Sequence, residues 1–178
     1  TVKLIFQPAE EGVPAGEEGG ADMMTRQGVL ENPKVDAVFG LHVFSGIPAG
    51  TLAWRPRGFM AASDELEIKV KGRSTHGAMP WRGVDPVVAS AQIVMALQTV
   101  VSRQAEITRA PAIVTIGSIH GGNRGNIIPD EVVMSGTIRS LDPKMQGVIH
   151  EAVRRIDNST AAAAGATAEV EIKGYAPV

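Results

Sequence analysis

The alternation of apolar and charged residues in the second part of the chain predicts a sheet with one buried and one exposed face. Apolar and charged residues alternate over residues 65–71, and the same alternation recurs over residues 168–173. Because successive side chains of a strand point to opposite faces, each strand directs its apolar side chains to one face and its charges to the other. Two further strands are predicted at residues 112–119 and 131–139.

Two helices are predicted between these strands, and both have the same start signal. Asp85 and Asp142 each precede a proline, which places an N-cap side chain before a proline at the first helical position. The second helix has an apolar stripe at helical spacing, and we expect His150 to be exposed on its polar face. The first helix, at residues 86–103, is apolar nearly all round, so one sheet face cannot cover it.

The predicted fold class is α+β. Residues 58–174 have the order β-α-β-β-α-β, which is typical of a ferredoxin-like domain with two helices on one face of an antiparallel sheet. Residues 1–57 predict a β-α-β slice of an α/β domain, in which apolar strands at residues 2–6 and 37–43 flank a helix at residues 20–27.

The ends of the chain suggest a piece of a longer polypeptide. The sequence opens directly in a predicted strand, without an initiator methionine or a polar leader. We interpret residues 175–178 as the start of a return to the α/β domain.

Composition excludes several classes of function. The 17 basic and 19 acidic residues give a formal charge of −2, which provides no basic field for nucleic acid. No run of about 18 apolar residues is present, so we expect no membrane span. The absence of cysteine excludes disulfides and thiolate metal sites, and it is compatible with the cytoplasmic location that we expect.

Paired carboxylates follow the first predicted strand. Adjacent side chains at a strand end point in different directions, so of Glu10 and Glu11 one could bind a metal ion while the other acts as a base. Solvated acids in a turn are the alternative. His42 lies in an apolar run 31 residues after Glu11, where a hydrogen-bonded core histidine is an equally simple interpretation.

Three further polar residues stand at the ends of predicted elements. His76 lies between threonine and glycine after an amphipathic strand, which indicates an exposed and positioned imidazole, or else an ordinary turn. Asn126 and Arg139 are polar groups that a ferredoxin-like core does not require.

Four motifs taken together resemble the metal-dependent amidohydrolases of the aminoacylase, hippurate hydrolase and carboxypeptidase G family. They occur in the family's order over essentially the whole chain, as FQPAEEG at residues 6–12, GLHV at 40–43, GRSTHGAMP at 72–80, and NIIPD with GTIR at 126–130 and 136–139. The first motif is nearest to the hippurate hydrolase and auxin-conjugate hydrolase branch. The resemblance implies a zinc-peptidase-like α/β catalytic domain, interrupted by a ferredoxin-like lid that also dimerises the protein.

The resemblance also implies roles for the candidate residues. Glu10 matches the general base, and Glu11 and His42 match metal ligands. His76 matches the lid histidine that reaches the neighbouring subunit's active site and steadies the oxyanion. Asn126 and Arg139 match substrate contacts, and the planar fork of Arg139 suits a substrate carboxylate.

The implied cofactor is a pair of divalent metal ions, zinc in the first place, with manganese or cobalt as alternatives. The family's other ligands have no counterpart in these 178 residues, and they would lie before Thr1 and after Val178. We therefore expect an incomplete metal site, and a chain that is inactive by itself.

The implied function is metal-dependent hydrolysis of the amide bond of N-acyl amino acids. A metallo-carboxypeptidase or dipeptidase of the same family is an alternative, with a peptide as substrate. A non-catalytic ferredoxin-like binding or dimerisation module is an alternative of another class, but such a module has no use for the paired carboxylates of residues 1–57.

The partner predicted for the chain is a second copy. The apolar helix at residues 86–103 would be covered if it and an edge strand paired with the same elements of that copy. We expect Val94 and Leu97 to face the partner.

Overall fold

The computed structural model describes residues 1–14, 16–56 and 58–177. The chain divides into a first unit, Thr1–Leu52, and a sheet unit, Ala53–Val178. The first unit contains the helix α1 (Gly20–Arg26). The sheet unit contains, in chain order, β1 (Ala62–Lys71), β2 (Thr75–His76), η1 (Pro80–Arg82), α2 (Pro86–Thr99), η2 (Val100–Gln104), β3 (Ala112–Gly121), β4 (Ile127–Ile128), β5 (Glu131–Ser140), α3 (Pro143–Ala163) and β6 (Thr167–Ala176).

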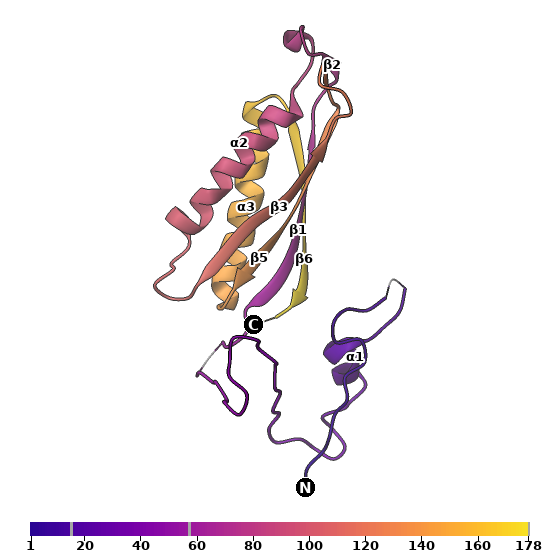
Figure 1. Ribbon diagram of the computed structural model, residues 1–178, viewed down its shortest axis with the longest axis vertical. Coiled ribbons are helices and arrows are strands. Elements are labelled where there is room, and N and C mark those ends of the chain that lie inside the picture. The colour runs from indigo at the N-terminus through magenta and orange to yellow at the C-terminus, as the bar shows by residue number, and fades with distance from the viewer. Residues whose placement is uncertain (15, 57, 178) are drawn as a thin grey trace. The chain divides into compact units, whose positions relative to one another are not determined.

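The ferredoxin-like prediction is confirmed. The four long strands form one antiparallel sheet in the order β3-β5-β1-β6, and α2 and α3 cover the same face of it (Figure 1). A separate short ladder joins β2 to β4 beyond one end of this sheet. The strand β6 continues to Ala176, two residues past the expected end of the lid. The domain boundary after residue 57 stays a prediction.

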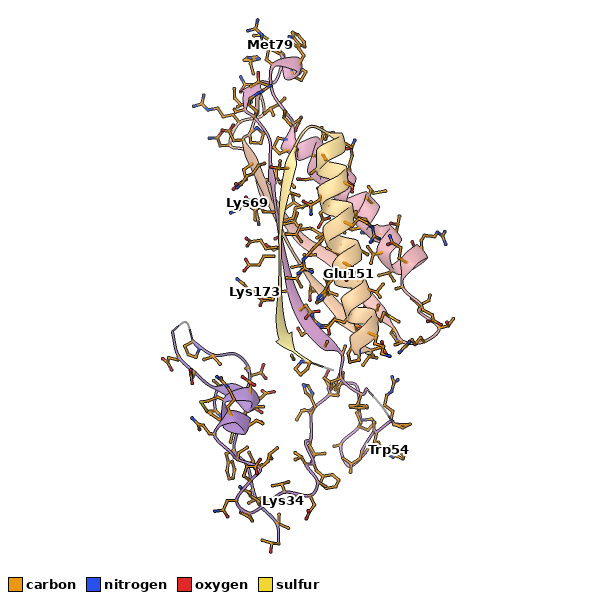
Figure 2. All side chains as sticks on the ribbon, turned by 180° about the vertical axis from the view of Figure 1, so that it is seen from behind. Lys34, Trp54, Lys69, Met79, Glu151 and Lys173 are labelled. Carbon is orange, nitrogen blue, oxygen red and sulfur yellow. The ribbon has the colours of Figure 1, made fainter. Side chains whose placement is uncertain are left out.

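The two faces of the sheet differ as the alternation of residues predicts. Along β1, buried Leu66, Ile68 and Val70 point to the helices, and they join a core that includes Ile93, Met134, Ile138, Ile149 and Val153. Lys69 and Lys173 point away from the helices, and Glu151 projects outward from α3 (Figure 2). No helix in the described part of the chain is long and apolar enough to cross a membrane.

The predicted helix starts are confirmed. The Asp85 carboxylate accepts hydrogen bonds from the amides of Val87 and Val88, at 2.8 and 3.2 Å. Asp142 accepts from the Met145 amide at 2.8 Å, and that bond, aided by the Arg109 guanidinium at 3.0 Å, lowers the pKa of Asp142. Both caps satisfy helix amides that have no partner within the helix.

The helix α2 is apolar nearly all round, but its outward face differs from the one we expected. Leu97 is only 1 % exposed and belongs to the core, so it cannot meet a partner. Val94 is half-buried against the same core. The exposed large apolar residues of α2 are Val87, Val88 and Met95, the last with 72 % of its surface in solvent.

Among its described residues, 1–14 and 16–52, the first unit has the predicted helix but no strands. Residues 2–6 and 37–43 are not paired with any strand in the described residues, and Leu4 and Phe39 are 75 % and 93 % exposed. A buried parallel strand needs a neighbour along its edges and helices over its faces. The described residues of this unit do not supply them, which explains why two apolar segments stay unpaired.

Two buried aspartates in the sheet unit differ in their hydrogen bonding. Asp64 on β1 accepts hydrogen bonds from Gln146 at 2.9 and 3.0 Å and contacts His150 Nε2 at 2.8 Å. The expectation that His150 is an exposed surface residue is therefore wrong, because this contact turns the ring toward the sheet. Asp157 on α3 has no hydrogen-bond partner among the described residues, and its burial raises its pKa to about 7.

Asp157 predicts a pH-dependent stability. Its pKa in the folded chain, about 7, lies above the ordinary value of 3.8, so between these values the folded state keeps a proton that the unfolded chain releases. The free energy of unfolding should fall as the pH rises through this window, and this contribution should be constant above it. Urea unfolding across the window should show a flatter profile for Asp157→Asn than for the unaltered protein. Parallel profiles would contradict the assignment.

Candidate active site

The loop that carries His76 is fixed to the residues before β5. The amide of Gly77 donates to the carbonyl of Asn126 at 2.8 Å, and the amide of Ser74 donates to the Asp130 carboxylate at 2.7 Å. A side chain at position 77 would place its Cβ 3.1 Å from that same carbonyl, so this close approach favours glycine. We call residues 72–83 with 121–130 the tip of the sheet unit.

The hydrogen bonds of His76 determine which ring nitrogen carries its proton. Its Nδ1 accepts a hydrogen bond from the Ala78 amide at 3.1 Å. An amide can only donate, so the neutral ring carries its hydrogen on Nε2. The side chain is exposed, and Nε2–H is therefore available as a donor to a group outside the tip.

Asn126 lies beside His76, but Arg139 does not. The ladder of β2 with β4 pairs His76 with Ile127, so Asn126 and His76 share the tip. Arg139 lies near the other end of β5, opposite Ser63 of β1. Arg139 is eight positions after the start of β5 at Glu131, which is about 25 Å along a strand. The structure thus brings together two of the three candidate residues of this unit.

Glu10 and Glu11 lie in an exposed turn of the first unit. The turn closes through the Gly12 amide, which donates to the Ala9 carbonyl at 3.2 Å. Ala9 has a φ of +51°, in the left-handed region that non-glycine residues seldom adopt. Such strained positions occur where the surrounding structure fixes a functional group, and here the next residue is the candidate base.

The ring of His42 has the opposite arrangement to that of His76. Its Nδ1 lies 2.8 Å from the carbonyl of Val43, which can only accept, so Nδ1 donates. The neutral ring then keeps a lone pair on Nε2, the form that a metal ligand requires. The side chain is exposed and stacks obliquely on Phe44, so the alternative of a buried core histidine is not what the structure has.

The donors of the first unit fit a zinc site in kind but not in number. A carboxylate from Glu11 and an imidazole from His42 are common zinc ligands. Among the described residues there is no cluster of three or more histidine, cysteine, aspartate or glutamate side chains that could hold a metal ion. These residues could therefore be two ligands of a larger set.

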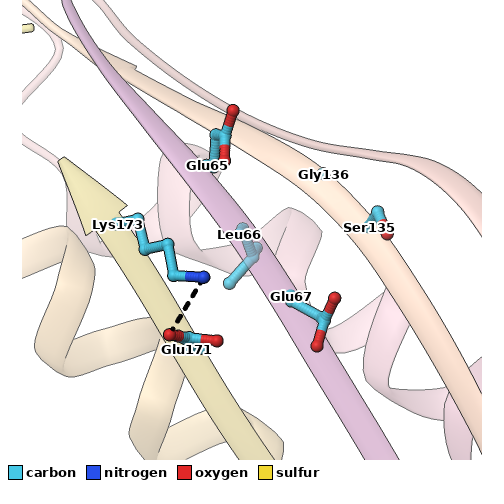
Figure 3. A pocket seen from close by; sticks show the side chains of 7 residues that line it. All are labelled: Glu65, Leu66, Glu67, Ser135, Gly136, Glu171 and Lys173. Atoms are coloured by element: carbon cyan, nitrogen blue, oxygen red, sulfur yellow. Dashed lines mark ion pairs between the residues drawn. The ribbon is translucent and has the colours of Figure 1, made fainter. Parts of the chain in front are cut away.

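A hollow of the sheet unit lies away from every candidate residue. It has a volume of about 280 Å³ and lies on the face of the sheet without helices, over Gly136, with Glu65, Glu67, Glu171 and Lys173 around it (Figure 3). Lys173 pairs with Glu171 at 3.2 Å. A Cβ at Gly136 would overlap the backbone carbonyl oxygen of Thr115, so the glycine permits the close approach of β3 to β5.

Asp130 is a residue of the tip that the sequence did not reveal. Its carboxylate and its backbone carbonyl accept from Ser74 and Gly72, at 2.7 Å each, and so fix both ends of the segment before His76. In the sequence, an aspartate after a proline is an ordinary turn residue. The role of Asp130 comes from its contact with a loop 56 positions earlier in the chain. No local pattern signals such a contact.

Comparisons with known proteins show similarity over nearly the whole chain. Residues 62–172 match the description of a peptidase dimerisation domain. The chain is 41 % identical over 170 residues to thermostable carboxypeptidase 2 of Saccharolobus solfataricus, covering 96 % of this chain and 42 % of that protein. It is 37 % identical over 177 residues to N-acetylcysteine deacetylase of Bacillus subtilis, covering 99 % of this chain and 44 % of that protein.

One solved structure shares both the fold and much of the sequence. The crystal structure of the Bacillus subtilis YXEP protein, described as a dinuclear metal binding peptidase from the M20 family, matches with a TM-score of 0.72 and 33 % identity. The match covers 97 % of this chain and 40 % of that one. The chain thus spans less than half the length of the curated relatives that it matches.

The anchoring role of Asp130 gives a testable expectation for the whole protein. In Asp130→Ala the Ser74 amide loses its acceptor, so the loop of His76 should become more mobile and turnover should fall about tenfold. Asp130→Asn keeps an acceptor oxygen and should retain most turnover. Steady-state kinetics of both variants measure the difference, and equal loss of activity in both would contradict the anchoring role.

Proposed function

The chain belongs to the peptidase dimerisation domain (M20) family, and we propose that the whole protein is a metal-dependent hydrolase of the amide bond of N-acyl amino acids. The relatives of this chain include proteins named as a carboxypeptidase and as a deacetylase. In this proposal the chain supplies part of the catalytic domain and the lid.

One observation carries the proposal: the two candidate histidines have complementary ring protonation. The lone pair on Nε2 of His42 suits a metal ligand, whereas Nε2–H of His76 suits a donor to an oxyanion. Hydrolysis of an amide needs both, because a carbonyl must be polarised and the charge that develops on its oxygen must be stabilised.

The remaining steps follow from the chemistry of the other candidate residues. Bound divalent ions, with zinc favoured and manganese or cobalt as alternatives, would polarise the scissile carbonyl and lower the pKa of water, and Glu11 and His42 would be two of their ligands. The free carboxylate of Glu10 would accept the proton of the attacking water and pass it to the leaving amine. Asn126, beside His76, would contact the substrate.

Arg139 would receive the carboxylate of the amino acid. Its guanidinium is half-buried and forms no ion pair with any described carboxylate, although arginine usually finds one when it is removed from water. A substrate carboxylate could supply the missing charge in a bidentate pair. An N-acyl amino acid and a peptide both end in such a carboxylate.

A homodimer through α2 and β3 belongs to the same proposal. Of the two edge strands, β3 is the one that α2 contacts, and Ile119 on it is half exposed although it lies opposite the buried Met134. Together with Val87 and Met95 this makes an apolar surface beside an unpaired strand edge. A second copy would cover both, and a tip could then reach the partner's catalytic residues.

The role of Glu10 is tested by Glu10→Gln in the whole protein. The amide cannot take a proton, so kcat should fall by about 100-fold or more, while the metal content stays unchanged. Glu17→Gln, an exposed change in the same loop, is the matched control and should retain full activity. An unchanged kcat in Glu10→Gln would exclude it as the base.

The dimer is tested by Met95→Asp. Because Met95 is exposed, the substitution should leave the fold intact and place a desolvated charge in the interface, which should give monomers of lower activity. Light scattering at micromolar concentration measures the mass. Ser159→Asp adds the same charge to the exposed face of α3, outside the proposed interface, and should leave the dimer intact. If the unaltered protein is itself monomeric, the dimer proposal fails.

A carboxypeptidase is the second candidate, favoured by the similarity to thermostable carboxypeptidase 2. The two functions differ in what precedes the scissile bond, which is an acyl group in one and a peptide in the other. Turnover of N-acetyl and N-benzoyl amino acids, compared with dipeptides that end in the same amino acid, separates them. Faster turnover of the dipeptides would favour the second candidate.

A further inference from the structure

We propose that Thr137 is a positioning residue, whose hydroxyl holds the guanidinium of Arg139 in the orientation that receives the substrate carboxylate. The inference rests on the proposed function for the identity of the ligand. Its basis is a chain of hydrogen bonds that crosses the sheet from Arg139 to the strand β1.

The first contact of this chain sets which edge of the guanidinium is free. Nη1 of Arg139 donates to the hydroxyl of Thr137 and, at 3.1 Å, to the carbonyl of Ile138. Nε and Nη2 have no acceptor among the described residues. These two nitrogens form one edge of the planar fork, and that edge is the one that can bind both oxygens of a carboxylate.

The second contact fixes the hydroxyl itself. Thr137 donates its proton to the backbone carbonyl of Asp64 at 3.1 Å. Since that proton is used, the oxygen can present only its lone pairs to Arg139, which favours the guanidinium as its partner. The hydroxyl therefore acts as a bridge between β1 and Arg139 rather than as a group free to rotate.

The far end of the chain is rigid. Asp64 is only 1 % exposed, and its carboxylate is held by Gln146 and His150 of α3 on the helix-covered face. The backbone of β1 at this residue pairs with Ile138 of β5 on one side and with Gly174 of β6 on the other. A hydrogen bond to this carbonyl thus ties Arg139 to a central strand of the sheet that is paired on both sides.

Strand propensity does not explain these contacts. Threonine is a common strand residue, and Thr115 lies directly opposite Thr137 on the neighbouring strand β3. The hydroxyl of Thr115 has no hydrogen bond to the described residues, whereas that of Thr137 has two. The same substitution can therefore be made at Thr137, which has the proposed positioning role, and at Thr115, which lacks it and serves as the control.

The experiment compares two substrates in the whole protein. One is an N-acyl amino acid and the other is its carboxamide, which lacks the negative charge that Arg139 would bind. Thr137→Val keeps the branched shape but removes the hydroxyl, and we expect it to raise KM for the acid about tenfold, with kcat and the kinetics of the carboxamide unchanged. Thr137→Ser keeps the hydroxyl and should resemble the unaltered protein, and so should Thr115→Val.

The outcomes separate this inference from the proposed function. Arg139→Gln should abolish the preference for the acid over the carboxamide. If it does so while Thr137→Val behaves as the unaltered protein, Thr137 has no positioning role. If Arg139→Gln leaves the preference intact, the carboxylate binds elsewhere and the role of Arg139 fails as well. Thr137→Ala replaces Thr137→Val if the latter does not fold, and an equal loss on both substrates would indicate a purely structural role.

Discussion

A sheet that has only one apolar face determines where the candidate residues of the sheet unit lie. The helices α2 and α3 cover that face, the charged face stays open, and the four paired strands separate the two ends of the sheet. His76 and Asn126 lie beyond one end, and Arg139 lies near the other, about 25 Å away along β5. One copy of the unit therefore cannot bring these side chains to the same substrate. Either the two groups of residues have separate roles, or a second copy of the chain brings one group to the substrate of the other.

The apolar surfaces left open favour the second copy. Val87 and Met95 of α2 are exposed beside the unpaired edge of β3, where an isolated unit would leave apolar area and backbone groups in water. If the β3 strands of the two copies ran in opposite directions, the tip of one copy would approach the end of the other copy's sheet that carries Arg139. Arg139, its bridge through Thr137 and the tip of the partner would then belong to one site.

The parts of the fold that follow from local chemistry could be predicted from the sequence, and the parts that depend on distant contacts could not. Alternation predicted β1 and β6, and the two Asp-Pro pairs located both helix starts. The buried face of α2 was not predictable, because apolar residues surround the whole helix and Leu97 and Met95 look alike in sequence. The contact of His150 with Asp64 joins residues 86 positions apart. The apolar segments at residues 2–6 and 37–43 have the composition of strands. Composition indicates that a segment can be buried, but it does not indicate whether neighbouring strands and helices are present to bury it.

The central claim, that His76 serves the site of Glu10 in the partner copy, can be tested by mixing two inactive variants of the whole protein. Glu10→Gln and His76→Asn homodimers each lack one essential group at every site. After subunit exchange, a mixed dimer has one site with both groups intact, so an equal mixture should recover about a quarter of the unaltered activity. If both residues act within one chain, every site of the mixed dimer stays defective. Failure to recover activity after proven exchange would contradict the account.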